Sequence, residues 1–385
     1  MHLPPSPPWL YPRAAYVHVP FCAHQCGYCD FAVAVGQDQQ IDAYLDALAM
    51  ELATLGRPRA VRTLFIGGGT PSHLDVRQLE RLLTMLHHWL PVRGQVAESE
   101  FSLEANPDSL DADKIALLAE RGVTRVSLGA QSFQPDVLRV LERQHRAEEV
   151  AVVVEQLKRK IPFVSLDLIF GVPGQTLAAW DRDLRHALAL APDHLSTYGL
   201  TFEKGTRLWK QRQRGELRPL EEDTELAQYR HAMDTLQAAG FEHYEISNFA
   251  QPGCRSRHNQ VYWANHAYWG FGVGAARYVH GCRQLNTRSL STYLNKVLTG
   301  ESPVFQSETL PPKERARETI AVQLRRADGI ERRAFREQTG YDVDTLVGPK
   351  IAELQELGLL DDDGRRICLT RPGKCVADAV IMRLM

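Results

Sequence analysis

The feature that most constrains the fold is a six-fold alternation of strand-like and helix-like segments between residues 14 and 240. Short runs rich in apolar residues at 15–19, 61–66, 101–104, 125–128, 163–170 and 194–200 predict strands. Apolar residues at helical spacing follow them at 41–55, 75–90, 114–121, 147–160, 177–190 and 221–239. Right-handed crossovers between parallel strands place such helices on the outside of the sheet. The sequence therefore predicts an α/β fold, a partial (β/α)6 TIM-like barrel over residues 14–240.

Two segments flank the predicted barrel. Residues 1–13 contain five prolines and lack a basic region followed by an apolar core, so they are expected to form an extended arm rather than a signal peptide. The prolines are Pro4, Pro5, Pro7, Pro8 and Pro12. Residues 241–300 have a looser pattern that includes His-Asn-Gln-Val-Tyr-Trp at 258–263. We interpret this stretch as an extension of the barrel.

Residues 301–385 are expected to form a small, mainly helical module. Helices are predicted near 314–326, 331–338 and 350–357, with a turn at 361–364, a short strand at 367–370 and a last helix. This outline is winged-helix-like. A nucleic-acid interface would need an electropositive face, yet residues 306–385 hold fourteen Lys plus Arg against fourteen Asp plus Glu. We therefore interpret the module as a cover or docking element.

Composition limits the class of protein further. The 385 residues are 44% hydrophobic, which is enough to fill a sizeable core. The longest apolar run, 163–172, is interrupted by Ser165 and Asp167 and is too short to span a bilayer. The net charge of −2 gives no sign of a polyanionic partner. We expect a cytoplasmic protein with no transmembrane segment and no nucleic-acid partner.

Three cysteines lie close together directly after the first predicted strand. Cys22, Cys26 and Cys29 have the spacing Cys-x3-Cys-x2-Cys, which places three sulfurs on one loop. Three thiolates can ligate three irons of a [4Fe–4S] cubane and leave the fourth iron open. A zinc site is the alternative, but it needs a fourth ligand, for which only His24 or Asp30 is near in sequence.

A disulfide framework does not fit seven cysteines in a chain with no recognisable secretory leader. The other four cysteines are scattered, show no ligand spacing and are expected to be reduced: Cys254, Cys282, Cys368 and Cys375.

Polar residues follow several of the predicted strands. The cysteine loop, the glycines at 67–69, Glu104, Gln131 and Asp167 all fall at strand ends that should share one rim of the barrel. A cap or turn role would account for any one of them alone. Their convergence on one rim predicts a binding site there.

The cysteine spacing resembles the signature of the radical S-adenosylmethionine (SAM) superfamily, including an aromatic residue, Tyr28, just before the last cysteine. The run Gly-Gly-Gly-Thr-Pro at 67–71 is similar to the glycine-rich SAM motif of that superfamily. The resemblance implies a [4Fe–4S] cluster on Cys22, Cys26 and Cys29, SAM at the open iron, and Tyr28 near the adenine. In that superfamily the cluster donates an electron that cleaves SAM to a carbon-centred radical.

Further motifs at 16–22, 127–133 and 167–173, together with the carboxy-terminal module, resemble the group that contains coproporphyrinogen dehydrogenase (HemN) and HemW. This resemblance covers nearly the whole chain. By matching motifs it implies SAM contacts at Tyr16, Gly68, Gly69, Thr70, Glu104, Gln131, Arg143 and Asp167. Residues 301–385 would then be the HemN-type carboxy-terminal domain.

Two features favour the HemW type. The dehydrogenase branch has a further cysteine where this chain has Phe31, and the segments 244–250 and 258–263 are similar to HemW. Proteins of that type are regarded as heme chaperones that deliver heme to respiratory proteins, which would add a peripheral location at the membrane during delivery. The alternative is a radical SAM oxidoreductase acting on a porphyrinogen. A DNA-binding regulator is a third class, which the balanced charge of the module disfavours.

The chain departs from the group pattern at two places. Glu142 stands where a glycine is usual before the arginine, and Ala276 with Arg277 replaces a His-Ser pair. The second change leaves His258 as the main candidate for a heme ligand. A hydrogen-bonded structural histidine is the other interpretation of His258.

Overall fold

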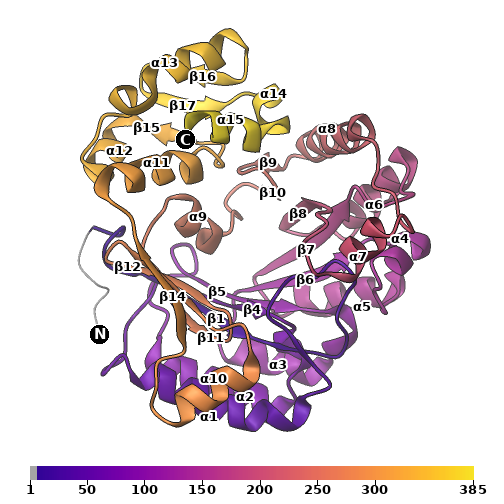
Figure 1. Cartoon of the computed structure of the whole chain (residues 1–385). Helices are drawn as coiled ribbons and strands as arrows, with labels where there is room; N and C mark the ends of the chain where they lie inside the picture. Colours follow the sequence, from indigo (N-terminus) through magenta and orange to yellow (C-terminus); the bar gives the residue numbers. More distant parts are fainter. Residues whose placement is uncertain (1–6) are drawn as a thin grey trace.

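The computed structural model describes residues 7–385 and shows a curved nine-stranded sheet with a smaller module beside it (Figure 1). The strand order is β11-β1-β4-β5-β6-β7-β8-β10-β9. In that order the strands are Trp269–Gly272, Ala14–Val19, Thr63–Gly68, Glu100–Ala105, Arg125–Gln131, Phe163–Phe170, His194–Gly199, Asn248–Ala250 and Glu242–His243. The six predicted strands are β1 and β4 to β8, and neighbours among them pair in parallel. The predicted α/β partial barrel is confirmed.

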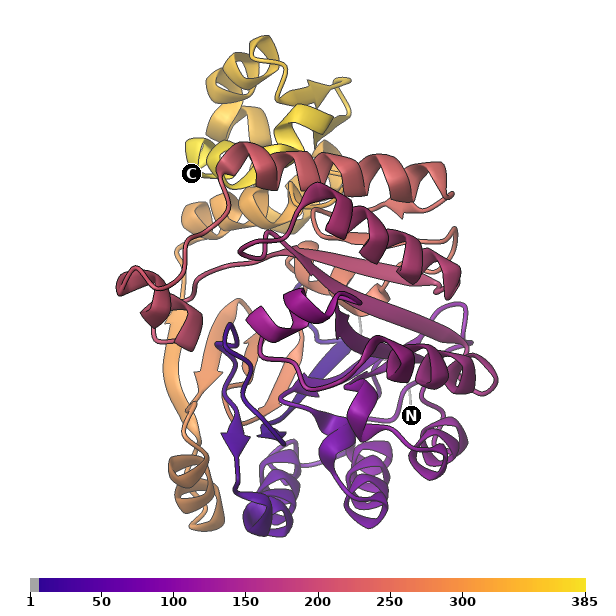
Figure 2. The ribbon, with the colours of Figure 1, turned by 90° about the vertical axis from the view of Figure 1, so that its right-hand side faces the viewer.

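The predicted barrel helices form the outer layer of the sheet (Figures 1 and 2). They are α1 Ile41–Ala53, α2 Val76–Trp89, α3 Ala112–Glu120, α5 Ala147–Lys158, α6 Leu177–Ala189 and α8 Glu222–Ala238. Helix α2 begins with a capping box, because Asp75 accepts the N–H of Gln78 and the Gln78 side chain accepts the N–H of Asp75. Over residues 7–385, none of the helices combines the length and the apolar character that a bilayer span requires.

Strand β11 was not predicted, because its sequence Trp-Gly-Phe-Gly lacks the run of β-branched residues that marks a strand. It pairs in parallel with β1 and extends the sheet beyond the first barrel strand. Gly270 is required there, since a side chain would collide with the backbone carbonyl of Ala276. Other elements that were not predicted are β2 Phe21–Cys22, β3 Ala34–Val35, α4 Pro135–Val140, α7 Arg207–Gln213, α9 Arg257–Trp263 and α10 Leu290–Leu298.

A three-stranded antiparallel sheet lies next to β11 and consists of β12 Ala276–Val279, β13 Cys282–Asn286 and β14 Val304–Thr309. The described part of the amino-terminal arm packs near it, where Pro8 accepts the N–H of Ala267. Pro4 and Pro5 lie outside the described residues. The domain boundaries after residues 13, 240 and 300 remain predictions, and β14 pairs with β13 although it follows residue 300.

The carboxy-terminal module has its own hydrophobic cluster. Its helices are α11 Pro312–Gln323, α12 Arg332–Thr339, α13 Val343–Glu356, α14 Arg371–Cys375 and α15 Ala377–Leu384, around the strands β15 Ile330–Glu331, β17 Arg366–Leu369 and β16 Leu360–Asp362. Helix α13 begins seven residues before the predicted start at 350. Pro349 lies inside this helix, but Val343, Val347 and Ile351 are buried on one continuous face and carry the helix through it.

Candidate functional site

Two cavities that share lining residues lie in the barrel, one at the carboxyl ends of the strands and one beside β1, β4 and α9. The first, the cluster cavity, has a volume of about 520 Å³ and is lined by the three loop cysteines and by Tyr28, Gly68, Gly69, Thr70, Glu104, Gln131, Arg143 and Asp167. The second, the aromatic cavity, has a volume of about 590 Å³ and is bordered by Tyr16, Phe65, His258, Tyr262, Trp263 and Tyr268. Asp30, Phe31 and Glu104 border both cavities. The predicted site residues therefore belong to two cavities: Tyr16 and His258 border the aromatic cavity, and the others line the cluster cavity.

The cysteine loop presents all three sulfurs to the cluster cavity. The N–H of Cys29 donates to the carbonyl of Cys26 at 3.2 Å, and the Cys22 sulfur lies 3.3 Å from the Thr70 hydroxyl. Burial raises the pKa of the Cys22 thiol to about 12, so positive charge from bound iron would be needed to hold its thiolate. Among residues 7–385, no three His, Cys, Asp or Glu side chains converge on a single-ion site. Three thiols around one cavity fit a cluster in which each sulfur takes its own iron.

The glycine run brings the end of β4 against its neighbouring strands. Gly68 has a φ of +109°, and a side chain there would collide with the His18 ring of β1. The Gly68 N–H donates to the Glu104 carboxylate at 2.9 Å. Burial raises the pKa of Glu104 to about 7, with a smaller rise from the nearby Asp167. The glycines thus serve packing between strands as well as the cavity wall.

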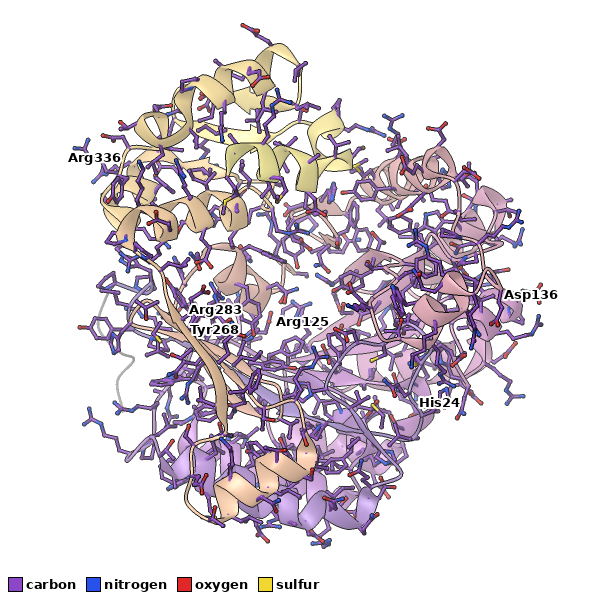
Figure 3. The ribbon with its side chains drawn as sticks, viewed as in Figure 1. His24, Arg125, Asp136, Tyr268, Arg283 and Arg336 are labelled. Carbon is purple, nitrogen blue, oxygen red and sulfur yellow. The ribbon has the colours of Figure 1, made fainter. Side chains whose placement is uncertain are left out.

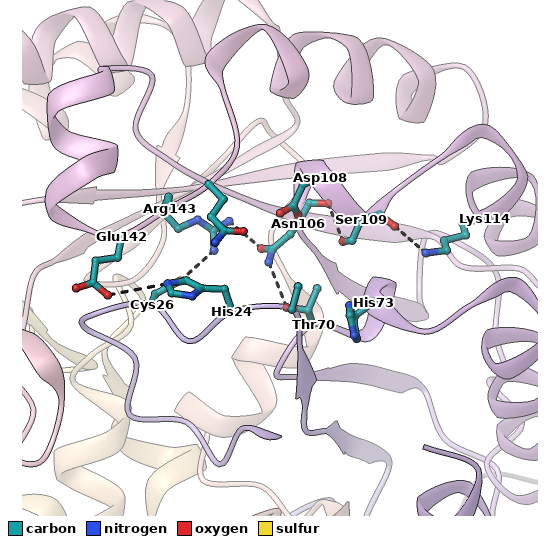
Figure 4. A pocket seen from close by; sticks show the side chains of 12 residues that line it. His24, Cys26, Thr70, His73, Asn106, Asp108, Ser109, Lys114, Glu142 and Arg143 are labelled. Atoms are coloured by element: carbon teal, nitrogen blue, oxygen red, sulfur yellow. Dashed lines mark hydrogen bonds and ion pairs between the residues drawn. The ribbon is translucent and has the colours of Figure 1, made fainter. Parts of the chain in front are cut away.

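A chain of polar contacts links the cysteine loop to the glycine run (Figure 4). Arg143 donates to the Cys26 sulfur at 3.5 Å, to the Gly129 carbonyl at 2.7 Å and to the Asn106 side-chain oxygen at 2.8 Å. The Asn106 amide donates to the Thr70 hydroxyl at 3.2 Å. Asn106 is not among the residues predicted from the sequence. Its position two residues after Glu104, at the end of β5, is the signal that could have found it.

The far wall of the cluster cavity is formed by the ends of β6 to β8. The Ser127 hydroxyl donates to Asp167 at 3.0 Å, and burial raises the pKa of Asp167. Gln131 has a φ of +62° next to a register shift between β6 and β7, and the irregularity ends the strand with its side chain at the cavity. Ser127 and Tyr198 also border the cavity and were not predicted.

Glu142 occupies the position where a glycine was expected, and its φ of +56° explains that expectation. Its carboxylate lies 2.7 Å from Arg207 and 4.0 Å from the His24 ring. Arg207 also donates to the carbonyl of Gln25 in the cysteine loop. The side chain of Glu142 therefore ties the turn before Arg143 to the loop that carries the cysteines.

The aromatic cavity is built around helix α9. His258 exposes none of its surface, and its ring stacks on Phe65 with centroids 5.2 Å apart. Its Nδ1 lies 2.9 Å from the Thr63 hydroxyl and its Nε2 lies 2.7 Å from the Tyr262 hydroxyl. Burial lowers the pKa of His258 to about 4, so the ring is neutral near pH 7.

A buried ion pair fixes the start of α9. Glu100 accepts hydrogen bonds from the N–H groups of Arg257 at 3.0 Å and His258 at 3.2 Å, and it pairs with Arg125 at 3.1 Å. Arg125 also donates to the carbonyl of Cys254. Burial alone would raise the pKa of Glu100, but Arg125 and these N–H groups lower it below its usual value.

Two arginines border the aromatic cavity. Arg283 lies next to Tyr268, with its Nη1 3.5 Å from the Tyr268 hydroxyl, and pairs with Glu318 at 3.0 Å (Figure 3). Arg288 pairs with Asp30 at 3.2 Å. The cavity therefore combines flat aromatic walls with cationic groups, which suits a planar ligand that carries carboxylates.

Comparisons with known proteins agree with this geometry. The Radical SAM superfamily profile matches residues 16–187, and the HemN C-terminal domain profile matches residues 310–376. The structure superposes on coproporphyrinogen III oxidase (HemN) from Escherichia coli with a TM-score of 0.84 at 24% identity, over 97% of this chain and 90% of that chain. This likeness establishes the fold.

Curated relatives span nearly the whole chain. Heme chaperone HemW from Bacillus subtilis is 37% identical over 96% of this chain and 98% of its own length. Heme chaperone HemW from Lactococcus lactis is 38% identical over 94% of both chains. The mitochondrial radical S-adenosyl methionine domain-containing protein 1 of Bos taurus is 33% identical over 99% of this chain and 89% of its own length. The chain therefore belongs to the HemW family of heme chaperones within the radical SAM superfamily.

Proposed function

We propose that the protein is a heme chaperone that binds a [4Fe–4S] cluster and SAM in the cluster cavity and carries heme in the aromatic cavity. The observation that carries this proposal is the junction of the two cavities at Asp30, Phe31 and Glu104. One side offers three thiols and charged groups, and the other offers aromatic faces. A protein that binds an iron–sulfur cluster next to a planar cargo needs a thiol-lined cavity and an aromatic cavity that adjoin each other.

The residues of the cluster cavity fit the cluster and SAM. Cys22, Cys26 and Cys29 would hold the cluster, which when bound supplies an electron for SAM chemistry in this superfamily. Arg143 donates a hydrogen bond to the Cys26 sulfur at 3.5 Å and would orient that ligand beside the cluster. The ammonium of SAM would face the acceptors Glu104 and Asp167, and its adenine would lie near Tyr28.

Gly68, Gly69 and Thr70 would form the opposite wall of the SAM site, where the absence of side chains on the glycines lets the ligand approach the backbone. Gln131 would supply a further donor and acceptor from the end of β6. Tyr16 borders the aromatic cavity instead, so we propose that it separates SAM from the cargo.

The residues of the aromatic cavity fit heme as a cargo. Its volume of about 590 Å³ lies within the range of small-molecule sites, and its walls are mainly aromatic. Arg283 and Arg288 are the cations that could meet the propionates of heme. His258 borders the cavity and remains a candidate for the heme site.

Support for a chaperone over a porphyrinogen oxidase comes from the names of the relatives and from Phe31. The relatives at 34–38% identity are named heme chaperones. Phe31 is 65% exposed and stands on the wall between the cavities, where a further cysteine would mark the oxidase branch. Delivery would be to heme-accepting proteins of respiration, with the carboxy-terminal module as a docking element.

The test is anaerobic reconstitution of the cluster followed by two parallel assays. The first titrates the protein with hemin and follows its absorption spectrum. The second supplies coproporphyrinogen III with SAM and a reductant and analyses the porphyrins by chromatography. We expect heme binding and no decarboxylated product. Efficient formation of protoporphyrinogen IX would contradict the chaperone proposal and would show that the protein is an oxidase.

A further inference from the structure

The residues around α9 identify which group can reach an iron ion in the aromatic cavity. Histidine is the usual expectation for a heme ligand, and two histidines border this cavity, His18 and His258. Both are almost fully buried, with exposed fractions of 4% and 0%. The question is therefore whether either ring has a nitrogen available.

Neither histidine has a free nitrogen. In His18, Nε2 lies 2.8 Å from the Ala32 carbonyl and Nδ1 lies 3.0 Å from the Tyr16 hydroxyl. In His258, Nδ1 and Nε2 contact the hydroxyls of Thr63 and Tyr262. An iron at His258 Nε2 would displace the Tyr262 hydroxyl from its partner and would have to enter a position where the ring has no accessible surface. Coordination by His258 thus requires rearrangement of α9.

The Tyr262 hydroxyl is placed differently. It comes from the last turn of α9, the residue is only partly buried, and it borders the aromatic cavity. The Tyr268 ring packs edge-on against the Tyr262 ring with centroids 4.7 Å apart, which fixes the plane of the phenol. Its oxygen already points at a ring nitrogen that can accept a proton. Phenolate oxygen is an established axial ligand of ferric heme in proteins.

Resting on the heme-binding function proposed above, we propose that Tyr262 is the axial ligand of ferric heme and that His258 is the positioning residue that holds and deprotonates it. As the iron–oxygen bond forms, the phenol O–H bond breaks and the proton passes to His258 Nε2. Nδ1–H of the same ring donates to Thr63. The iron remains ferric, and no electron is exchanged. Glu100, which accepts the backbone N–H of His258, offsets the charge of the resulting imidazolium.

Tyr16 is the competing phenol, since it borders the same cavity and its hydroxyl also contacts a histidine. Glu104 lies near both phenols and does not distinguish them. Protonation of His18, which contacts the Tyr16 hydroxyl, is opposed by the nearby cation Arg288, whereas protonation of His258 is favoured by Glu100. Tyr16 also stacks on Phe65 at a centroid distance of 6.1 Å, deeper on β1. These contacts favour Tyr262 over Tyr16.

The experiment compares ferric heme complexes of the full-length parent and four variants by resonance Raman and electron paramagnetic resonance spectroscopy. We expect the parent to show phenolate ring modes coupled to iron. Tyr262→Phe should lose these modes and bind heme about tenfold more weakly, a loss equal to about 1.4 kcal/mol. Tyr268→Phe and Tyr16→Phe should keep them. Circular dichroism and iron and sulfide content of the reconstituted cluster confirm that each variant is folded.

His258→Gln separates positioning from ligation. Glutamine can still hydrogen-bond the phenol, so we expect the phenolate modes to shift in frequency and heme affinity to fall by about tenfold, as for partners of metal ligands in general. Modes that survive in Tyr262→Phe but vanish in Tyr16→Phe would overturn the assignment. A histidine-type spectrum that Tyr262→Phe leaves unchanged would also overturn it, with heme binding itself intact. A parent that binds no heme would instead refute the proposed function.

Discussion

The cluster cavity and the aromatic cavity differ in how the chain assembles them. The cluster cavity is built from residues at the carboxyl ends of consecutive parallel strands, so short motifs in sequence order become neighbours in space. The aromatic cavity takes residues from β1 and β4, from α9, from the sheet of β12 and β13 and from α11, up to 306 residues apart between Tyr16 and Val322. The cluster cavity is therefore formed by the barrel alone, whereas the aromatic cavity depends on how residues 241–300 pack against the barrel.

The largest expected effect separates the two cavities completely. Cys29→Ala should abolish the cluster, because three thiolates are needed to hold it, while heme binding by the aromatic cavity persists. Iron and sulfide analysis after anaerobic reconstitution measures the first property, and a hemin titration measures the second. Cys254→Ala is the control and should retain both. Undiminished iron and sulfide in Cys29→Ala would contradict the ligand assignment.

The second prediction concerns the ion pair of Glu100 and Arg125 beneath α9. Here the variant should affect the aromatic cavity more than the cluster cavity. Glu100→Gln leaves Arg125 buried without its counter-charge and should lower the free energy of unfolding by about 3–5 kcal/mol. The matched control is Glu98→Gln, which breaks an exposed pair with Arg62 and should cost about 1 kcal/mol or less. Urea unfolding measures both.

The same Glu100→Gln variant should weaken heme binding more than cluster assembly, because Glu100 holds the start of α9. Equal losses of cluster and heme would mean that the two cavities are not independent.

The third prediction concerns Glu104, which borders both cavities. Burial raises its pKa from 4.5 to about 7, so the unfolded chain releases this proton at lower pH than the folded protein does. The contribution of Glu104 to stability is therefore present below pH 4.5 and is lost as pH rises to about 7. The loss is about 3 kcal/mol at most.

Glu104→Gln cannot titrate and should remove this part of the pH dependence. Urea unfolding of ligand-free parent and variant between pH 4.5 and 8 gives the difference directly. A difference in stability that stays constant across this range would show that Glu104 does not titrate there.

The fourth prediction is confined to the cluster cavity. SAM should perturb the electron paramagnetic resonance signal of the reduced cluster, and Asp167→Ala should raise the SAM concentration needed for that change about tenfold. Asp136→Ala is the control, since this side chain is 88% exposed on the outer surface (Figure 3). A reduced cluster whose spectrum ignores SAM would refute the SAM site altogether.

The same contrast explains what the sequence could predict. Periodicity located the six barrel strands, because buried parallel strands and their helices carry strong apolar patterns. Strand-end polarity located Glu104 and Asp167 in the cluster cavity. Strand β11 and helix α9 escaped, because the glycines of β11 and the short polar turn of α9 acquire their structure from contacts with β1 and with Glu100. Local patterns do not contain such long-range contacts.

The roles of single residues show the same limit. Gly68 and Gly69 line the cluster cavity, but the packing of Gly68 against His18 depends on a neighbouring strand that the sequence does not specify locally. The sequence allows His258 to be either a ligand or a structural residue, and only the positions of Thr63 and Tyr262 reveal that both of its nitrogens are engaged. Thr63 is separated from His258 by 195 residues.

The smallest expected effect tests Glu142, which ties the turn before Arg143 to the cysteine loop through Arg207. Its φ of +56° favours glycine, whereas its carboxylate gains a partly exposed ion pair with Arg207. Glu142→Ala loses the pair and keeps the strain, so we expect the alanine variant to be less stable than Glu142→Gly by about 1 kcal/mol. At Arg185, an exposed position within α6 that also forms one ion pair, the order should be reversed, because glycine is the poorer helix former by a similar amount. Urea unfolding of the four variants at one pH provides the comparison. An alanine variant as stable as the glycine variant at residue 142 would mean that the turn before Arg143 relaxes when the ion pair is removed, and that the contact with Arg207 is what holds Glu142 in this conformation.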